Sequence, residues 1–293
     1  MPTDRFANHE SQQKWSPNSV STWIVVPCFN EADRLQVATF EAYRRLHPSI
    51  GFIFVDDGST DETAAILEQL RTRLAPNASW LQMRENRGKA EAVRRGIQCA
   101  IELGAEYTGY WDADLATPLD AIEPMRQIAE RRPELLAVLG CRFPMLGRDI
   151  QRKPLRRLQS RLFASAASRV LGTPVLDTQC GAKLLRVSRR VSELFGSPFL
   201  TRWIFDVEWL ARLNVLAPTG VSLSKLVYEF PLDQWREVDG SKLTFRAAVK
   251  AATQLGTIAR KVRPRRWSPS DDSESLGQDT IWHGPPRPQR LVA

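Results

Sequence analysis

The stretch Tyr107-Thr-Gly-Tyr-Trp-Asp-Ala-Asp114 decides the fold class, because a short apolar run in it ends in a pair of carboxylates. Two earlier stretches have a similar form: Trp23–Val26 is soon followed by Glu31, and Phe52–Val55 runs directly into Asp56-Asp57-Gly58. Each apolar run has the length and continuity of a strand that is buried on both faces. Helically spaced segments separate the runs. The sequence therefore predicts a single-domain, Rossmann-like α/β fold with a mostly parallel sheet flanked by helices.

The rest of the chain extends this pattern into one ordered domain over 21–242. Two helix starts are predicted from capping residues: Ser59-Thr-Asp-Glu62 matches a capping box, and Thr117-Pro118 offers an N-cap followed by proline at the first helical position. An amphipathic helix is expected at 243–263, whereas 1–20 and 264–293 are expected to be disordered. Further strands are expected at 79–84, 135–139 and 221–230, further helices at 33–46, 88–103, 152–171 and 203–213, and a loop at 177–183.

The acidic residues after the strands predict a ligand site. In parallel α/β sheets, ligands bind beyond the carboxyl ends of the strands. Asp112 and Asp114 are two residues apart, so in an extended chain their side chains point the same way with Cα atoms about 6.5–7 Å apart. Such a pair suits Mg²⁺ or Mn²⁺, which proteins hold with one or two carboxylates together with phosphate oxygens of a substrate.

Bulk properties narrow the function classes. The formal net charge is +8, which favours an anionic partner such as a nucleotide or a phospholipid surface. The chain lacks GxGxxG after its first strand and lacks GxxxxGK[ST], which disfavours dinucleotide dehydrogenases and P-loop NTPases. Its four cysteines form no CxxC pair, which disfavours a disulfide framework or a zinc site. No apolar run is long enough to span a bilayer, and the polar N-terminus lacks the apolar region of a signal peptide. We therefore expect a cytoplasmic protein, in peripheral contact with the inner membrane face if its acceptor is a lipid.

A family resemblance emerges from several motifs taken in order. The chain resembles the family 2 glycosyltransferases of GT-A fold, over roughly residues 22–245. Within that family it is similar to the dolichyl-phosphate β-glucosyltransferases and other polyprenyl-phosphate glycosyltransferases. The motifs that carry the resemblance are Val26-Pro-Cys-Phe-Asn-Glu31, Val55-Asp-Asp-Gly-Ser-Thr-Asp61, Asn86-Arg-Gly-Lys-Ala90, Asp112-Ala-Asp114, Gly140-Cys-Arg142, Asp177-Thr-Gln-Cys-Gly-Ala-Lys183, Phe205-Asp-Val-Glu208 and Trp235 to Lys242.

The resemblance implies a role for each matching residue. Asp112 and Asp114 would hold the metal, Asp114 and Arg142 would act in catalysis, and Arg157 and Arg161 would lie near an acceptor phosphate. Ala116 resembles the glucosyl relatives, since the mannosyl relatives carry Gln there, so UDP-glucose is the favoured donor. The resemblance also implies inversion at the sugar carbon. The residues expected to bind the donor are Pro27, Phe29, Glu31, Asp57, Lys89, Asp112 and Lys242.

The acceptor is predicted from chemistry. A hydroxyl acceptor normally needs a general base, for which Asp206 and Glu208 are candidates, with Asp206 preferred. A lipid phosphate is already anionic and needs cations instead. Residues 142–161 supply seven arginines and lysines, which fits a polyprenyl-phosphate acceptor. The basic amphipathic helix at 243–263 could contact a membrane or could equally pack on the domain.

Three alternatives stay open at this stage. The same fold could transfer a sugar to a soluble or protein acceptor, which the lack of an N-terminal anchor favours. A non-catalytic nucleotide-binding or membrane-binding module would not need the intact Asp112/Asp114 pair. A nucleic-acid binder is suggested by charge alone and lacks a supporting motif, so no nucleic-acid partner is expected.

Overall fold

The computed structural model describes residues 20–237, 245–262 and 279–284. Of the predicted disordered termini, residues 1–19, 264–278 and 285–293 lie outside the described residues. The predicted donor-binding residue Lys242 also lies outside them.

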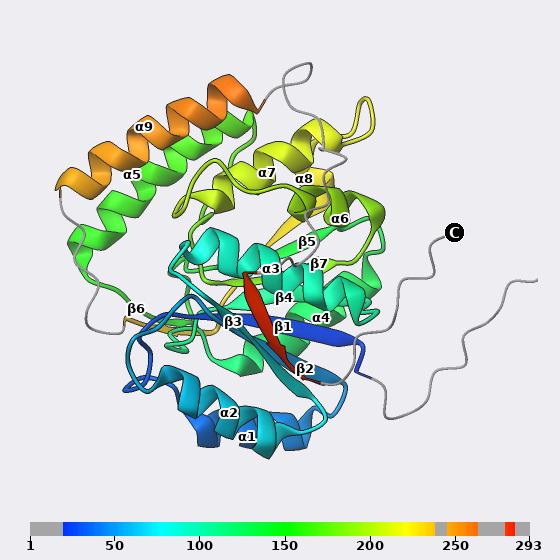
Figure 1. Ribbon diagram of the computed structural model, residues 1–293. Helices are drawn as coiled ribbons and strands as arrows, with labels where there is room; N and C mark the ends of the chain where they lie inside the picture. Colours follow the sequence, from blue (N-terminus) through cyan, green and yellow to red (C-terminus); the bar gives the residue numbers. More distant parts are fainter. Residues whose placement is uncertain (1–19, 238–244, 263–278, 285–293) are drawn as a thin grey trace, which may run out of the picture.

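The described residues form an eight-stranded central sheet in the order β10-β3-β2-β1-β4-β7-β5-β8 and a small two-stranded sheet of β6 and β9 (Figure 1). Strands β3, β2, β1 and β4 run parallel, as do β5 and β8, whereas β7 and β10 are antiparallel to their neighbours. The mostly parallel sheet is thus confirmed. The strands are β1 Thr22–Cys28, β2 Ile50–Asp56, β3 Ala78–Met83, β4 Tyr107–Trp111, β5 Ala137–Cys141, β6 Asp149–Gln151, β7 Ala182–Arg186, β8 Val227–Pro231, β9 Gln234–Arg236 and β10 Thr280–His283.

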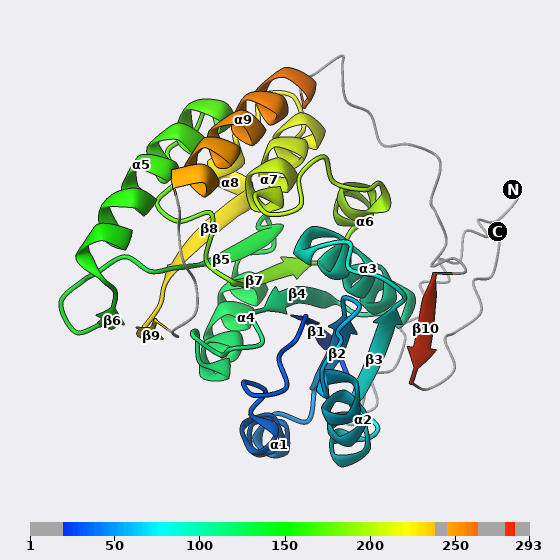
Figure 2. The same cartoon turned by 60° about the vertical axis from the view of Figure 1, so that its left-hand side comes forward.

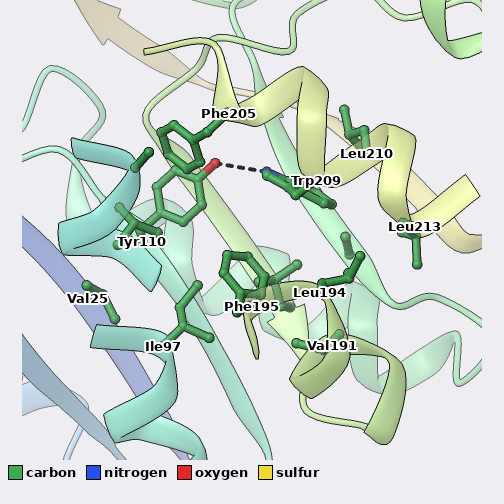
Figure 3. Close-up of a cluster of buried hydrophobic side chains, with 14 of the residues drawn as sticks. Val25, Ile97, Tyr110, Val191, Leu194, Phe195, Phe205, Trp209, Leu210 and Leu213 are labelled. Carbon is green, nitrogen blue, oxygen red and sulfur yellow. Dashed lines mark hydrogen bonds between the residues drawn. The ribbon is translucent and has the colours of Figure 1, made fainter. Parts of the chain in front are cut away.

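Helices cover both faces of this sheet (Figure 2). One core lies between the sheet and α3, α5, α6, α7 and α9, and the other lies under α1, α2 and α4. Figure 3 shows part of the first core, where Phe205 and Trp209 of α7 pack around Tyr110 of β4. The helices are α1 Val37–Leu46, α2 Thr63–Leu74, α3 Lys89–Glu102, the 3₁₀ turn η1 Leu119–Ala121, α4 Ile122–Arg131, α5 Pro154–Leu171, α6 Arg189–Gly196, α7 Phe205–Leu216, α8 Leu223–Leu226 and α9 Phe245–Lys261.

The strand order reverses between β1 and β4, and this is where the sheet opens. After β1 the chain goes to β2 and β3 on one side, and then crosses back to β4 on the other. Strand β1 pairs with β2 along its whole length, but with β4 only from Thr22 to Val25. Pro27, which has no backbone N–H, lies beyond the last pair with β4. Such a switch point places a crevice at the carboxyl ends of the strands.

Both predicted helix caps are wrong in detail. No side chain caps the N-terminus of α2; instead the Asp61 carboxylate accepts hydrogen bonds from the Thr63 N–H and hydroxyl at 3.0 and 2.5 Å. Pro118 directly precedes the 3₁₀ turn η1, and α4 starts only at Ile122. Thr117 is buried with its hydroxyl 3.8 Å from Cys180 Sγ, so contact with the core replaces capping.

Three predicted segments differ from the structure. The loop expected at 177–183 contains the start of the antiparallel strand β7, and the strand expected at 221–230 shrinks to β8 because residues 223–226 form α8. Within the tail expected to be disordered, Thr280–His283 pairs with β3 as strand β10. This pairing is reinforced by His283, whose ring stacks on Trp80 with centroids 4.1 Å apart.

The predicted amphipathic helix exists as α9, and its partner within the described residues is the domain itself. Leu255, Ile258 and Val262 are buried in the core shared with α5 and α7. These three apolar side chains therefore do not form a membrane-facing surface. No helix among residues 20–237, 245–262 and 279–284 is both long enough and apolar enough to cross a bilayer.

Candidate active site at the carboxyl ends of the central strands

Acidic side chains from three strand ends converge on the crevice, as predicted from sequence. Glu31 follows β1, Asp56 ends β2 with Asp57 directly after it, and Asp112 and Asp114 follow β4. Asp57 Oδ1 and Oδ2 accept hydrogen bonds from the N–H groups of Arg87 and Gly88 at 2.7 and 2.8 Å, which fixes the start of α3. Asp57 is therefore primarily a support for the loop that carries Lys89.

Lys89 and Asp112 form the closest charged pair of the crevice, with Nζ 2.5 Å from Oδ1. Burial alone would lower the pKa of Lys89, but Asp112 and Asp206 outweigh it and hold the pKa above its usual value. Asp112 is further fixed by its N–H, which donates to the Gly181 carbonyl at 2.9 Å. A Cβ at Gly181 would lie 1.8 Å from Asp112 Oδ2, so only glycine permits this position of the carboxylate.

Glu31 and Asp114 carry negative charge that their neighbours do not fully neutralise. Burial raises the pKa of Glu31 to about 7, with Asp114 and Asp112 adding to the effect and the ion pair to Arg34 at 2.7 Å opposing it. Burial and the charge of Asp112 likewise raise the pKa of Asp114. Glu31 Oε2 is buried without a hydrogen-bond partner. Glu31, Asp112 and Asp114 thus form a site that favours a cation. Together with Asp57, whose oxygens accept backbone N–H groups, they are here called the carboxylate edge.

The carboxylate edge fits a divalent ion shared with a substrate. Among the described residues, no group of three or more His, Cys, Asp or Glu side chains could enclose a metal by itself. Asp112 and Asp114 nevertheless suit an ion whose other ligands are waters and phosphate oxygens, which is the usual way proteins bind Mg²⁺.

A buried network lies beneath Lys89 and contains the predicted base. Asp206, only 4% exposed, accepts a hydrogen bond from the Tyr110 hydroxyl and pairs with Lys183 Nζ at 2.7 Å. The Tyr110 hydroxyl in turn accepts the Trp209 indole N–H at 3.3 Å (Figure 3). Lys183 is fully buried and also donates to the Cys180 carbonyl. These contacts fix the position of the Asp206 carboxylate within the fold.

Glu208, the other candidate base, has a structural role. It is fully buried, and its oxygens accept from Arg212 Nη2 at 2.6 Å and from the N–H groups of Leu200 and Thr201 at 2.9 and 3.1 Å. These contacts use both of its oxygens within α7 and to the loop before it, so it is not available as a base.

Arg142 belongs to the second, basic half of the site, and its charge is paired with that of a neighbouring carboxylate. Its Nε and Nη2 bind the two oxygens of Asp177 at 2.6 and 2.8 Å. Asp177 outweighs burial and raises the pKa of Arg142, and Asp112 contributes in the same direction. Arg142 therefore lies within electrostatic reach of the carboxylate edge. Glu229 completes the arrangement by accepting the Asp177 N–H at 2.8 Å.

Three further arginines line a cavity of about 180 Å³ beside this pair. Together with Arg142 they are called the arginine cavity: Arg142, Arg152, Arg157 and Arg161. Arg152 Nε is buried without a hydrogen-bond partner, and burial together with the charge of Arg142 lowers the pKa of Arg152. A partly buried guanidinium with an unused donor is expensive unless an anion satisfies it. The predicted pair Arg157 and Arg161 does lie together on the wall of this cavity.

The donor residues predicted on β1 lie at the mouth of the crevice. Pro27 is half-buried beside Val55, and Phe29 is 43% exposed directly after the strand. Asn30 turns the chain in a left-handed conformation with φ of 53°. An exposed ring beside the crevice suits a planar ligand.

Four residues that shape the site had no individual role assigned from sequence. These are Arg152, Asp177, Gly181 and Lys183. Arg152 was counted only among the seven basic residues of 142–161. The other three belong to the polar stretch 177–183, which was expected to be a loop, so their signal was present as a motif without assigned roles. The partner of Arg142 could not be found from sequence, because Asp177 is 35 residues away.

A Rossmann-like, mostly parallel sheet with acidic residues at its switch point is typical of the GT-A class of glycosyltransferases. The family model for glycosyl transferase family 2 matches residues 23–190, more than half of the chain. The chain belongs to this family and is a glycosyltransferase.

Individual relatives agree with this assignment. A dolichyl-phosphate beta-glucosyltransferase of Dictyostelium discoideum is 30% identical, covering 80% of this chain and 72% of the relative. Glucosyl-3-phosphoglycerate synthase from Mycobacterium tuberculosis, in complex with UDP, is 17% identical with a TM-score of 0.60, covering 82% of this chain and 80% of that one. The same enzyme with Mn²⁺ and UDP-glucose, again 17% identical, gives a TM-score of 0.55 and covers 83% and 76%. At this identity the solved structures show the fold.

Proposed function

We propose that this glycosyltransferase transfers glucose from UDP-glucose to a polyprenyl or dolichyl phosphate. The observation that carries the proposal is the arginine cavity next to the carboxylate edge, with the unpartnered Arg152 Nε in its wall. A hydroxyl acceptor would need no such cluster of cations, whereas a phosphate monoester would. The Dictyostelium relative, a dolichyl-phosphate beta-glucosyltransferase, supports the same acceptor.

On the donor side, Phe29, Pro27 and Glu31 would contact the base, and Asp112 and Asp114 would face the diphosphate. A Mg²⁺ or Mn²⁺ held by Asp112 and Asp114 would stabilise the negative charge that develops on the leaving diphosphate. The solved relative that binds Mn²⁺ together with UDP-glucose is consistent with this role. Lys89, which is close to Asp112 and positively charged, would add a second cation at the same place. Lys242 would complete the donor site.

On the acceptor side, a phosphate oxygen would attack the sugar carbon while the bond to the diphosphate breaks, which inverts the configuration. The attacking oxygen is already anionic, so no general base is required. Arg152, Arg157 and Arg161 would hold the phosphate. Arg142, neutralised by Asp177, would orient the cavity toward the donor. We infer that Asp206 is a positioning residue for Tyr110 and Lys183.

A donor screen tests the proposal. Purified protein is incubated with Mg²⁺ or Mn²⁺, a short polyprenyl phosphate and each radiolabelled nucleotide sugar, and the label in the organic phase is counted. We expect organic-phase label from UDP-glucose, and its loss on addition of EDTA. Organic-phase label from another nucleotide sugar alone would keep the acceptor and change the donor. No organic-phase label with any donor would refute the acceptor.

A soluble phosphorylated acceptor is the second candidate. It is favoured by one observation: the arginine cavity of about 180 Å³ is large enough for a small phosphorylated molecule. Label appearing in an aqueous product with a small phosphate ester, and none in the organic phase, would support this alternative.

A further inference from the structure

Helix α5 has an exposed apolar stripe beside the arginine cavity. Leu155, Leu158 and Leu162, here called the leucine stripe, are 66, 56 and 64% exposed. Their spacing of three and four residues places them on one face of the helix. Figures 1 and 2 show α5 on the outside of the molecule, with α9 along one flank. The buried residues of α9 face the core, and the three leucines are exposed with α9 in place. Helix α9 therefore does not cover the stripe.

The stripe continues toward the mouth of the cavity. Arg161 lies three residues after Leu158 on the same helix and lines the cavity. Phe143 and Leu176 also line the cavity and are 41 and 55% exposed. Leu146, in the same loop as Phe143, is fully exposed. A phosphate held by the arginines would thus have apolar side chains around its exit.

The positive charge of α5 indicates which kind of partner this surface would bind. The helix contains Arg156, Arg157, Arg161 and Arg169 and no acidic residue. Lys153, directly before it, is 68% exposed. Apolar side chains that are flanked by cations suit the interface of an anionic membrane, where the leucines enter the acyl region and the cations stay among the headgroups.

We propose that the leucine stripe, together with the apolar rim of the cavity, docks the enzyme on an anionic lipid surface. This inference deepens the proposed function, since it assumes that the acceptor phosphate belongs to a membrane lipid. Docking would place the mouth of the cavity at the headgroup level, so the lipid phosphate would reach Arg157 and Arg161 without leaving the bilayer. The apolar tail would then need no binding groove in the protein.

Vesicle co-sedimentation tests the surface. The variant Leu155→Gln/Leu158→Gln/Leu162→Gln keeps the charge and uses a good helix former. Leu46→Gln on α1, where the leucine is 76% exposed, is the matched control. We expect the wild-type chain and the control to sediment with phosphatidylglycerol-containing vesicles, and less with pure phosphatidylcholine. For the triple variant the bound-to-free ratio should fall about tenfold or more.

The outcomes separate this proposal from the proposed function. If the triple variant transfers sugar normally to a short, water-soluble polyprenyl phosphate without vesicles, but poorly to a long one in vesicles, both proposals are supported. Normal vesicle binding by the triple variant would overturn the docking surface and leave the proposed function intact. Vesicle binding by the wild type without transfer to any lipid would do the reverse.

Two further measurements guard against other occupants. Sedimentation equilibrium would reveal a second copy on the stripe, since the triple variant would then change from dimer to monomer. A fall of the melting temperature by several degrees would reveal that another part of the chain covers the leucines. Either result would overturn the membrane surface.

Discussion

The carboxylate edge and the arginine cavity are neighbours with opposite charge and opposite construction. The edge consists of residues that follow β1, β2 and β4 within a few positions. The cavity is assembled from three separated segments, 141–144, 152–168 and 175–177. The first arrangement is dictated by a parallel sheet and the second only by tertiary packing. One chain therefore holds an acidic half and a basic half, and we expect that each can be disabled separately.

The largest expected effect comes from the carboxylate edge. Asp114→Asn should lower sugar transfer by about a thousandfold, since under the proposed function it removes a charge that would face the metal and diphosphate. Asp120→Asn is the matched control, because Asp120 is an exposed carboxylate on η1. Initial rates at saturating donor measure the effect. Equal rates for the two variants would show that Asp114 does not face the reaction.

The buried network between the two halves should respond in stability. Asp206→Asn leaves Lys183 buried without its ion pair, so we expect a loss of about 3 kcal/mol in the free energy of unfolding. The double variant Asp206→Asn/Lys183→Met should recover part of that loss in urea unfolding. If Asp206 were instead a general base, Asp206→Asn would abolish transfer with unchanged stability and would flatten the acidic limb of the pH–rate profile.

Gly181→Ala should damage the edge without changing its charges. The added Cβ would overlap Asp112 Oδ2 and push the carboxylate aside, so we expect about a hundredfold lower transfer. Gly196→Ala is the control, since nothing lies within 4 Å of a Cβ at that position. Steady-state kinetics at varied Mn²⁺ would show a raised metal requirement. An unchanged metal requirement would contradict the assigned position of Asp112.

The arginine cavity should respond through the acceptor alone. Arg157→Gln and Arg161→Gln are each expected to raise the acceptor KM by about ten- to a hundredfold, because each removes a charge-assisted contact to phosphate. The donor KM should stay unchanged. Arg169→Gln, near the other end of the same helix, is the control. A raised donor KM would move these arginines to the donor half and remove the contrast between the halves.

The smallest effect concerns Glu31 and pH. Burial raises the pKa of this carboxyl to about 7, against about 4.5 when unfolded. Between pH 4.5 and 7 the folded state thus holds a proton that the unfolded state releases. The contribution of Glu31 to the free energy of unfolding is therefore complete below pH 4.5 and is lost as pH rises through 7. Glu31→Gln should remove this dependence, and it should be more stable than wild type at pH 8.5 by on the order of 1–3 kcal/mol. Urea unfolding of both proteins over this pH window measures how the free energy of unfolding changes with pH. The same change with pH in both proteins would show that Glu31 does not titrate there.

The difference between the halves also explains what sequence reasoning could reach. Continuous apolar runs with polar ends made β1, β2 and β4 predictable. Their acidic residues were predictable too, because each lies within a few positions of the end of its strand in the sequence. Strand β7 was missed since its second residue, Lys183, is charged at a position that the fold buries with Asp206. Strand β10 was missed because its partner β3 is remote in sequence. No local pattern could have revealed that Asp177 neutralises Arg142.

The antiparallel pairing of β10 with β3 has a consequence for how this protein associates with itself. Asp279, just before β10, bonds Arg87 across 192 residues of sequence. During synthesis β3 therefore remains an open edge strand until β10 has been made, with backbone groups free to pair with another chain. In the finished protein, four residues cover that edge. A strand so short is among the first to detach, so the earliest aggregates should form by β3-to-β3 pairing, and their rate should follow the opening of β10 rather than global unfolding.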